Sequence, residues 1–262
     1  MQDEGLIDFG EPFKSLRNQG MILAPDGQKM SKSKGNTIQP DELIEQGYGA
    51  DSIRIMELFI GPWNQSAAWS VEGMGGSFRF LQRIWNLVQE HVAAEKSGEQ
   101  SEAMLRAVHG AVKKVSNDLA DMGFNTAIAA LMELTNDLYK LKTDVPMGAE
   151  VWKQTLITTV QLLAPFAPHI TEEMWQQLGQ EGSVHTSEWP TYDEKYLVQD
   201  TVTIAVQVNG KLRGTVTAPA DSDEAAVVEI AKADERIAAN LADKQVVKTI
   251  YVPGKLLNFV VK

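Results

Sequence analysis

No cysteine occurs among the 262 residues of this sequence. This absence excludes disulfide bonds, zinc sites built on thiolates and cysteine nucleophiles. It is also typical of proteins in the reducing cytoplasm, which is the location we predict. Long apolar runs are missing as well. The acidic start Met1-Gln2-Asp3-Glu4 leads into none, so the sequence predicts neither a signal peptide nor a membrane span.

Positively charged side chains are fewer than negatively charged ones. The chain has 24 lysine and arginine residues against 35 aspartate and glutamate residues, and its net charge is −11. Spread evenly, such a balance would argue against a nucleic-acid partner. However, residues 201–262 carry 8 basic and 7 acidic side chains, and three lysines gather near residue 30. Because nucleic acid responds to local patches, this class of partner stays open.

The most informative segment is the octet Lys29-Met30-Ser31-Lys32-Ser33-Lys34-Gly35-Asn36. Lysine ammonium groups act as point charges on phosphate oxygens, and serine hydroxyls add short hydrogen-bond donors. Gly35-Asn36 favours a sharp turn of the backbone. The segment therefore predicts a cationic loop that holds a polyphosphate. The alternative is a solvated basic turn.

Helical periodicity dominates the middle of the chain. A short strand at 21–24 and helices from Pro40 and over 51–59 come first, and from about 73 to 180 apolar residues recur at helical spacing. This pattern predicts four or five antiparallel helices packed as a bundle. The core is expected to include Leu81, Ile84, Trp85, Val88, Val92, Met104, Val108, Ala111, Val112, Val115, Ile128, Leu131, Leu138, Trp152, Leu156 and Val160.

The last sixty residues change period. Val202 to Val208 alternate, Asn209-Gly210 is a strong hairpin signal, and a return strand follows over 212–217. Asp221-x-x-Glu224 resembles a capping box before a helix that reaches about Asn240. Strands over 246–251 and 256–261 complete a ββαββ unit.

These features resemble known enzymes. The octet contains the KMSKS signature of class I aminoacyl-tRNA synthetases. The phrases Glu11-Pro12-Phe13, Gln19-Gly20-Met21, Tyr48-Gly49-Ala50-Asp51-Ser52-x-Arg54 and Ala164-Pro165-Phe166-Ala167-Pro168-His169 follow in the order of the leucyl, isoleucyl and valyl group. Phe80-Leu81-x-Arg83-x-Trp85 and Gln207-Val208-Asn209-Gly210-Lys211-x-Arg213-Gly214 resemble the leucyl-tRNA synthetases of bacterial type. The resemblance covers essentially the whole chain, which we interpret as a C-terminal part of such an enzyme.

The resemblance implies a fold that is mainly α. Residues 1–60 would be the end of an α/β catalytic domain with the lysine loop and a stem-contact region. Residues 61–182 would form an antiparallel bundle like the anticodon-binding domain of this class. Residues 183–200 would be a linker, and 201–262 a small α/β domain that contacts tRNA.

The implied activity is ATP-dependent formation of leucyl-adenylate, followed by transfer to tRNA(Leu). Lys29 and Lys32 are the expected catalytic residues, and Lys29, Met30, Ser31, Lys32 and Ser33 the expected ATP-binding residues. Lys34 and Asn36 are weaker candidates. Mg²⁺ is expected to accompany ATP, with no metal bound by the protein itself. We expect a monomer that reaches ATP and leucine through a half of the enzyme not present here.

The tRNA contacts are expected from Lys211, Arg213, Lys248 and Lys255. Lys211 and Arg213 would share the sheet face opposite Leu212. On the bundle, Arg106, Lys113 and Lys114 are candidates for phosphate contacts, but a solvated face is an equal alternative.

The sequence lacks two parts of a complete enzyme of this class, and it leaves two alternative identities open. The histidines are His91, His109, His169 and His185, none in the His-x-Gly-His pattern that class I enzymes need, and there is no room for an editing domain. We therefore expect the chain alone to be inactive. The alternatives are the tail of an isoleucyl- or valyl-tRNA synthetase, and a non-catalytic tRNA-binding protein derived from a synthetase.

Overall fold

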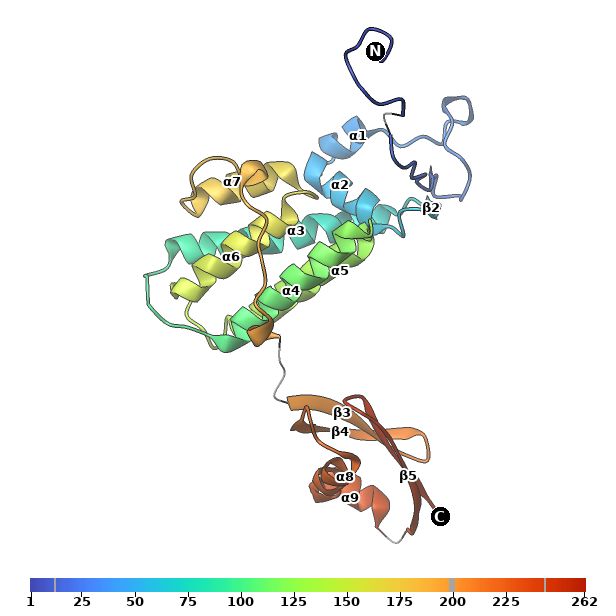
Figure 1. The fold of residues 1–262 in the computed structure, drawn as a ribbon, viewed down its shortest axis with the longest axis vertical. Helices are drawn as coiled ribbons and strands as arrows, with labels where there is room; N and C mark the ends of the chain where they lie inside the picture. Colours follow the sequence, from blue (N-terminus) through green and yellow to red (C-terminus); the bar gives the residue numbers. More distant parts are fainter. Residues whose placement is uncertain (12, 198–200, 243) are drawn as a thin grey trace. The chain divides into compact units, whose positions relative to one another are not determined.

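The computed structural model describes residues 1–11, 13–197, 201–242 and 244–262. Pro12 of the phrase Glu11-Pro12-Phe13 and residues 198–200 of the expected linker lie outside the described residues. The chain divides into a first unit, Met1–Glu194, and a second unit, Lys195–Lys262. The chain is rich in helix and carries a small sheet, as the sequence predicted (Figure 1).

The first unit begins with short elements that position the lysine loop. A two-residue strand, β1 (Ile22–Leu23), pairs in parallel with β2 (Ala67–Ala68). Between them lie α1 (Pro40–Glu45) and α2 (Ala50–Phe59). A small apolar cluster joins these elements, and its buried members are Leu43, Ile53, Met56, Trp69 and Met74.

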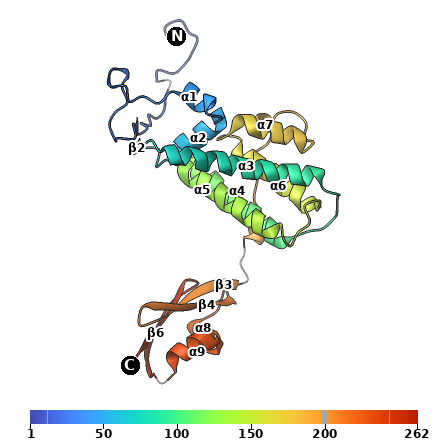
Figure 2. The same ribbon diagram turned by 180° about the vertical axis from the view of Figure 1, so that it is seen from behind.

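Five more helices follow: α3 (Val71–Ala93), α4 (Glu102–Ala120), α5 (Phe124–Leu141), α6 (Glu150–Leu163) and α7 (Pro168–Gln177). Helices α4 and α5 run side by side in both views, α4 also packs against α6, and α3 crosses this group in contact with α5 and α6 (Figures 1 and 2). Ser70 and Ser101 cap α3 and α4 by accepting hydrogen bonds from Gly73 and Met104.

The apolar face of each helix is buried in one cluster. Most residues expected in the core are confirmed as buried, among them Leu81, Ile84, Val88, Met104, Val108, Val112, Leu131, Leu138, Trp152, Leu156 and Val160. Trp85 is only partly buried against this core, and Val92, near the end of α3, is 44% exposed. No described helix has both the length and the apolar character that crossing a membrane requires.

The segment after α7 is more ordered than a linker. A short 3-10 turn, η2 (Val184–Thr186), buries Val184 in the main core. Farther on, the Trp189 Nε1–H donates to Ser116 Oγ at 2.8 Å. Residues 183–194 therefore fold onto the helices of the first unit, although their polar composition suggested a linker. Another 3-10 turn, η3 (Glu194–Tyr196), spans the division between the units.

The second unit is a four-stranded sheet with two helices on one side. Its elements are β3 (Thr201–Val208), β4 (Lys211–Pro219), α8 (Glu224–Ala233), α9 (Glu235–Leu241), β5 (Val246–Val252) and β6 (Leu256–Val261). The strand order is β4-β3-β6-β5, with β3 and β6 parallel and both outer pairs antiparallel. Its core includes Ile204, Val206, Val227, Ile237, Leu257 and Phe259.

Two local expectations for this unit were wrong. The helix expected to run to about Asn240 is broken at Asp234, whose carboxylate accepts from the N–H groups of Arg236 and Ile237 and starts α9. The first cap is Asp223 rather than Asp221, with Asp223 Oδ1 accepting from Ala226 N at 2.8 Å. The hairpin was predicted correctly: Asn209 and Gly210 have φ of 48° and 76°, the left-handed values that such a turn needs.

Candidate functional site

The lysine loop adopts a defined turn. Lys32–Lys34 form a short 3-10 helix, η1, that begins after the extended residue Ser31. Its backbone is closed by bonds from Lys34 N to Ser31 O and from Gly35 N to Lys32 O, at 3.1 and 3.2 Å. Gly35 ends the turn with φ of 67°, a conformation that glycine adopts without steric cost. The sharp turn predicted at Gly35 is thus confirmed.

Asn36 joins the two ends of this loop. Its Oδ1 accepts from Ser31 N at 2.8 Å, and its Nδ2 donates to Lys29 O at 3.3 Å. Inside the loop the hydroxyls of Ser31 and Ser33 lie 2.8 Å apart and share a hydrogen bond. One carboxamide therefore holds both flanks of the turn. The sequence ranked Asn36 low because its residue type alone did not show that it faces back into the loop.

Met30 anchors the loop to the protein. Its side chain is partly buried against the cluster of Leu43, Ile53, Met56, Trp69 and Met74. The lysines on either side, Lys29 and Lys32, are exposed. An apolar anchor between two exposed cations fixes the backbone while leaving both ammonium groups free to turn toward a ligand.

The electrostatics of the loop suit an anion. Within the described residues neither Lys29 nor Lys32 has an ion pair, whereas Lys34 Nζ donates to Gln28 Oε1 at 3.1 Å. The side chains of the turn are lysines and serines, which match phosphate oxygens. They do not match Mg²⁺, which prefers carboxylate and carbonyl oxygens. A magnesium ion accompanying ATP would be held by the phosphates rather than by this turn.

A second set of polar residues connects α2, which follows the lysine loop in the sequence, to the start of α7. Asp51, near the start of α2, accepts from the backbone N–H groups of His169 and Ile170 at 3.1 and 2.7 Å. Arg54, one turn later, donates from Nε to Phe166 O at 3.1 Å and from Nη2 to Pro165 O at 2.9 Å. Asp51 and Arg54 of the sequence phrase 48–54 thus bond to backbone groups in and next to the phrase 164–169.

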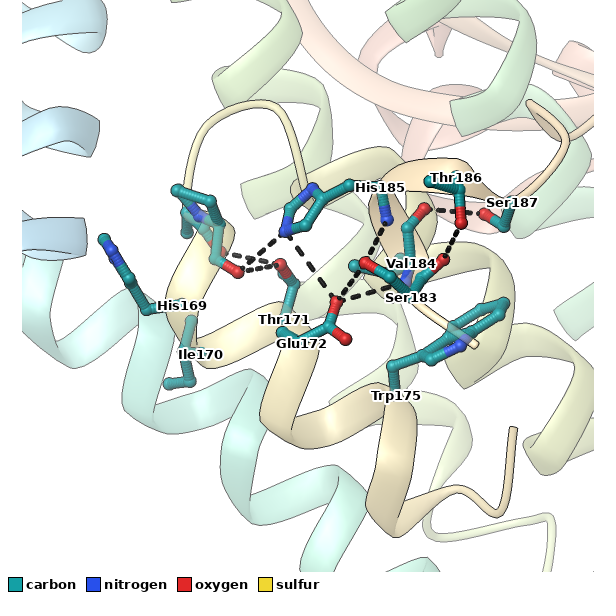
Figure 3. Close-up of polar contacts among 12 residues, drawn as sticks. His169, Ile170, Thr171, Glu172, Trp175, Ser183, Val184, His185, Thr186 and Ser187 are labelled. Atoms are coloured by element: carbon teal, nitrogen blue, oxygen red, sulfur yellow. Dashed lines mark hydrogen bonds and ion pairs between the residues drawn. The ribbon is translucent and has the colours of Figure 1, made fainter. Parts of the chain in front are cut away.

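His169 is not a core residue. Its backbone N–H is capped by Asp51, while its side chain is 73% exposed. A separate group lies on the other side of α7, where Glu172 Oε2 accepts from Ser183 Oγ and Val184 N at 2.8 and 3.1 Å. Figure 3 shows His169 turned away from this group. The two sets have structural roles, one at the start of α7 and one tying η2 to it.

His91 has a structural role. It is 3% exposed, and its Nδ1 bonds to the carbonyl of Met147. Burial lowers the pKa of His91 below its usual value, an effect that the bond to Met147 partly offsets. The residue is therefore neutral at neutral pH and joins α3 to the segment before α6.

Two of the three basic candidates on the helices are already paired within the chain. Lys113 Nζ lies 2.9 Å from Glu194 Oε1, and Lys114 Nζ lies 2.6 Å from Asp118 Oδ1. The hydrogen bond with Glu194 raises the pKa of Lys113. These contacts favour the alternative of a solvated, internally balanced face over phosphate contacts.

In the second unit the structure separates the four expected tRNA-binding residues. Lys211 and Arg213 are exposed on the edge strand β4, whereas Lys248 is exposed on β5 at the opposite edge. With neighbouring strands about 4.8 Å apart, these edges lie about 14 Å from each other. Lys255 lies in the β5–β6 turn, where its carbonyl accepts from Ala205 N. The four cations therefore lie at both edges of the sheet and in one turn, and they do not form one cluster.

A β-bulge changes the direction of Arg213. Leu212 pairs with Gln207 and Gly214 with Val206, so Arg213 is the extra residue on β4. The strict alternation expected between Lys211 and Arg213 is therefore broken. Arg213 lines a pocket of about 340 Å³ with Asp234 and Arg236 of the α8–α9 junction. The sequence did not suggest Arg236, because no local pattern links it to β4.

Comparisons with known proteins agree with this geometry. The chain matches a family model described as tRNA synthetases class I (I, L, M and V) over residues 6–70, which include the lysine loop. It matches another described as the anticodon-binding domain of tRNA ligase over residues 101–230.

Whole-chain relatives are similar as well. The leucine–tRNA ligases of Dehalococcoides mccartyi and Deinococcus radiodurans are each 46% identical to the chain over 263 residues, with 100% of this chain and 32% of theirs covered. A solved structure, the ternary complex of an Agrobacterium radiobacter LeuRS with tRNA and LeuAMS, is 33% identical with a TM-score of 0.73. It covers 100% of this chain and 34% of that one. The chain thus spans about a third of the length of these relatives.

Proposed function

Because this chain belongs to the leucine–tRNA ligase family and spans about a third of its relatives' length, we propose that it is the part of such an enzyme that carries the lysine loop and the tRNA-contacting units. In the whole enzyme the leucine carboxylate attacks the α-phosphorus of ATP and pyrophosphate leaves. The leucyl group then passes from the adenylate to tRNA(Leu), and AMP is released. The relatives named above favour leucine over the isoleucine and valine alternatives.

The lysine loop carries this proposal. Lys29 and Lys32 contact the triphosphate, and Lys32 faces the charge that develops on the departing pyrophosphate. A cation fixed at that place lowers the barrier because it stabilises the transition state more than the bound substrate. Met30, Ser31 and Ser33 hold the shape of the turn. The support is the exposure of both lysines on a backbone that Asn36 clamps.

The remaining regions of the chain contact tRNA. Residues 1–60 form the end of the catalytic domain and its stem-contact region, residues 61–182 an antiparallel anticodon-binding bundle, residues 183–200 a connection, and residues 201–262 a tRNA-contacting domain. Lys211, Arg213, Lys248 and Lys255 contact phosphates around the small sheet. The enzyme acts as a monomer in the cytoplasm.

The test uses the complete ligase of which this chain is a part. Replacement Lys32→Ala should lower leucine-dependent ATP–pyrophosphate exchange about 10²–10³-fold, or about 3–4 kcal/mol, by analogy with other preorganised donors. The matched control is Lys34→Ala, because Lys34 already bonds to Gln28. An equal loss in both variants would contradict a specific role for Lys32. The chain alone should show no exchange, and measurable exchange by it would contradict the division of labour proposed here.

A further inference from the structure

A pocket of about 390 Å³ opens where three segments distant in the sequence meet beside the α4–α5 turn. Arg17 and Asn18 come from the segment before β1, Trp63 and Asn64 from the loop between α2 and β2, and the turn 121–125 closes the third side. The volume lies within the range of small-ligand pockets. None of these residues belongs to the lysine loop or to the sheet of the second unit.

Several polar side chains that line this pocket have no bonding partner within the described part of the chain. Within the described residues the side chains of Arg17, Asn18, Asn64, Asp121 and Asn125 have no hydrogen bond and no ion pair. Asn36 and Asn136 of the same unit, by contrast, are each hydrogen-bonded within the chain. Three carboxamides, one guanidinium and one carboxylate therefore present both donors and acceptors to whatever enters.

The walls are built rigidly. Gly20 N donates to Trp63 O at 2.8 Å, and Met21 N donates to Ser66 Oγ at 3.1 Å. A Cβ on Gly20 would stand 1.9 Å from the carbonyl oxygen of Gln65, so only glycine permits this approach. On the other side the rings of Trp63 and Phe124 meet edge to face at 5.3 Å. These contacts tie all three segments together before any ligand binds, which limits the entropy lost on binding.

The chemistry of the lining selects the ligand. An isolated anion is disfavoured by Asp121, and an apolar molecule by the three carboxamides. A nucleotide uses all of them: carboxamides bond to base edges, a guanidinium to a phosphate, a carboxylate to a ribose hydroxyl or an exocyclic amine, and an indole ring packs on a base. We propose that this pocket holds one unpaired nucleotide of a bound tRNA. The inference rests on the proposed function, because it takes tRNA as the source of the nucleotide.

Both family matches contribute to the pocket. Residues 17, 18, 63 and 64 lie within the class I synthetase match, and residues 121 and 125 lie within the anticodon-binding match. The pocket thus sits at the junction of these two regions inside the first unit. Arg17 and Asn18 of the pocket belong to the segment that leads through β1 to the lysine loop. A nucleotide held there would therefore link the position of the tRNA to that of the loop.

The experiment is chemical probing of the bases of a leucine tRNA transcript, free and bound to this 262-residue chain. The variant is the pair Asn64→Ala with Asn125→Ala, and the matched control is Asn86→Ala with Gln176→Ala, two exposed amides with no side-chain bond among the described residues. The unaltered chain should protect an unpaired base. The pocket variant should lose that protection and bind about tenfold more weakly, as expected for two lost hydrogen bonds, while the control retains both. Arg17→Ala should make the fall of log affinity with log salt concentration shallower, with a slope smaller in magnitude by about one.

The outcomes separate this inference from the function on which it rests. If the chain binds the transcript and the pocket variant keeps both the protection and the affinity, the pocket assignment is wrong and the tRNA function stands. If the unaltered chain does not bind the transcript at all, both are overturned. Loss of one base's protection in the pocket variant alone supports the assignment.

Discussion

The carboxylate of Asp51 accepts hydrogen bonds from the backbone N–H and the ring Nδ1–H of His169, at 3.1 and 2.8 Å. The two residues are 118 positions apart in the chain. Asp51 lies near the start of α2 and caps the start of α7, whose own N-cap residue, Ala167, has no side chain that could do so. The contact therefore joins the region of the lysine loop to the end of the helical core.

Removing this cap should destabilise the first unit. Asp51→Ala leaves the N–H groups of His169 and Ile170 without their acceptor in a site where the Asp51 side chain is 9% exposed. We expect the free energy of unfolding to fall by about 1–3 kcal/mol, measured by urea denaturation with an unchanged slope. Asp41→Ala, at an exposed position in the first turn of α1, is the control. A change below about 0.5 kcal/mol would contradict the capping role.

Asn36 should control the rigidity of the lysine loop. Asn36→Ala removes the bonds to Ser31 N and Lys29 O together. A loss of about 1–2 kcal/mol of local stability increases the open population about 5–30-fold. Cleavage at Lys29, Lys32 or Lys34 by a lysine-specific protease should accelerate by a similar factor, because it follows that population. Global unfolding should not change, since Asn36 lies outside all three apolar clusters.

Gln39→Ala is the control for this experiment, because among the described residues the Gln39 side chain bonds to Thr37 and to no residue of the turn. Cleavage that accelerates equally in both variants would show that the segment opens without regard to the Asn36 bonds.

His91 should make the stability of the first unit depend on pH. Burial lowers its pKa in the folded state below the value of 6.5 that holds when the chain is unfolded. Below about pH 6.5 the unfolded chain therefore binds more protons, so stability is complete above that pH and declines as the pH falls through the folded-state pKa. Thermal unfolding between about pH 7.5 and 5.5 should show a larger drop for the unaltered chain than for His91→Gln. Equal drops would mean that other groups account for the dependence.

The edge strand β4 should contribute phosphate contacts to tRNA binding. Lys211→Ala with Arg213→Ala removes two exposed cations and should reduce the slope of log affinity against log salt by about 1.5. Lys232→Ala with Lys244→Ala removes the same charge elsewhere in the second unit and should change the slope less, because Lys232 lies near Glu229 and Lys244 bonds to Asn240 O. Equal affinities and slopes for the β4 variant and the unaltered chain would exclude this contact.

Sequence reasoning succeeded where the cause of structure is local. The strands of the second unit follow from alternation, and the hairpin at Asn209-Gly210 follows from two residues that tolerate positive φ. It failed where competing local signals were equal. Both Asp221 and Asp223 can cap a helix, and Asp234 could equally have remained inside one, so the positions of the caps required the packing of α8 and α9 on the sheet.

By itself, the sequence determined the family, the cationic loop and the apolar faces of the helices, because residue type and spacing dictate each of them. Only the tertiary structure decided that Asn36 faces back into its loop, that Asp51 caps α7 and that Arg213, at a bulge, lines one pocket with Arg236. It also decided that residues 17, 63 and 125 share one pocket. Such contacts depend on the direction of side chains and on the meeting of distant segments, which no periodicity along the chain encodes.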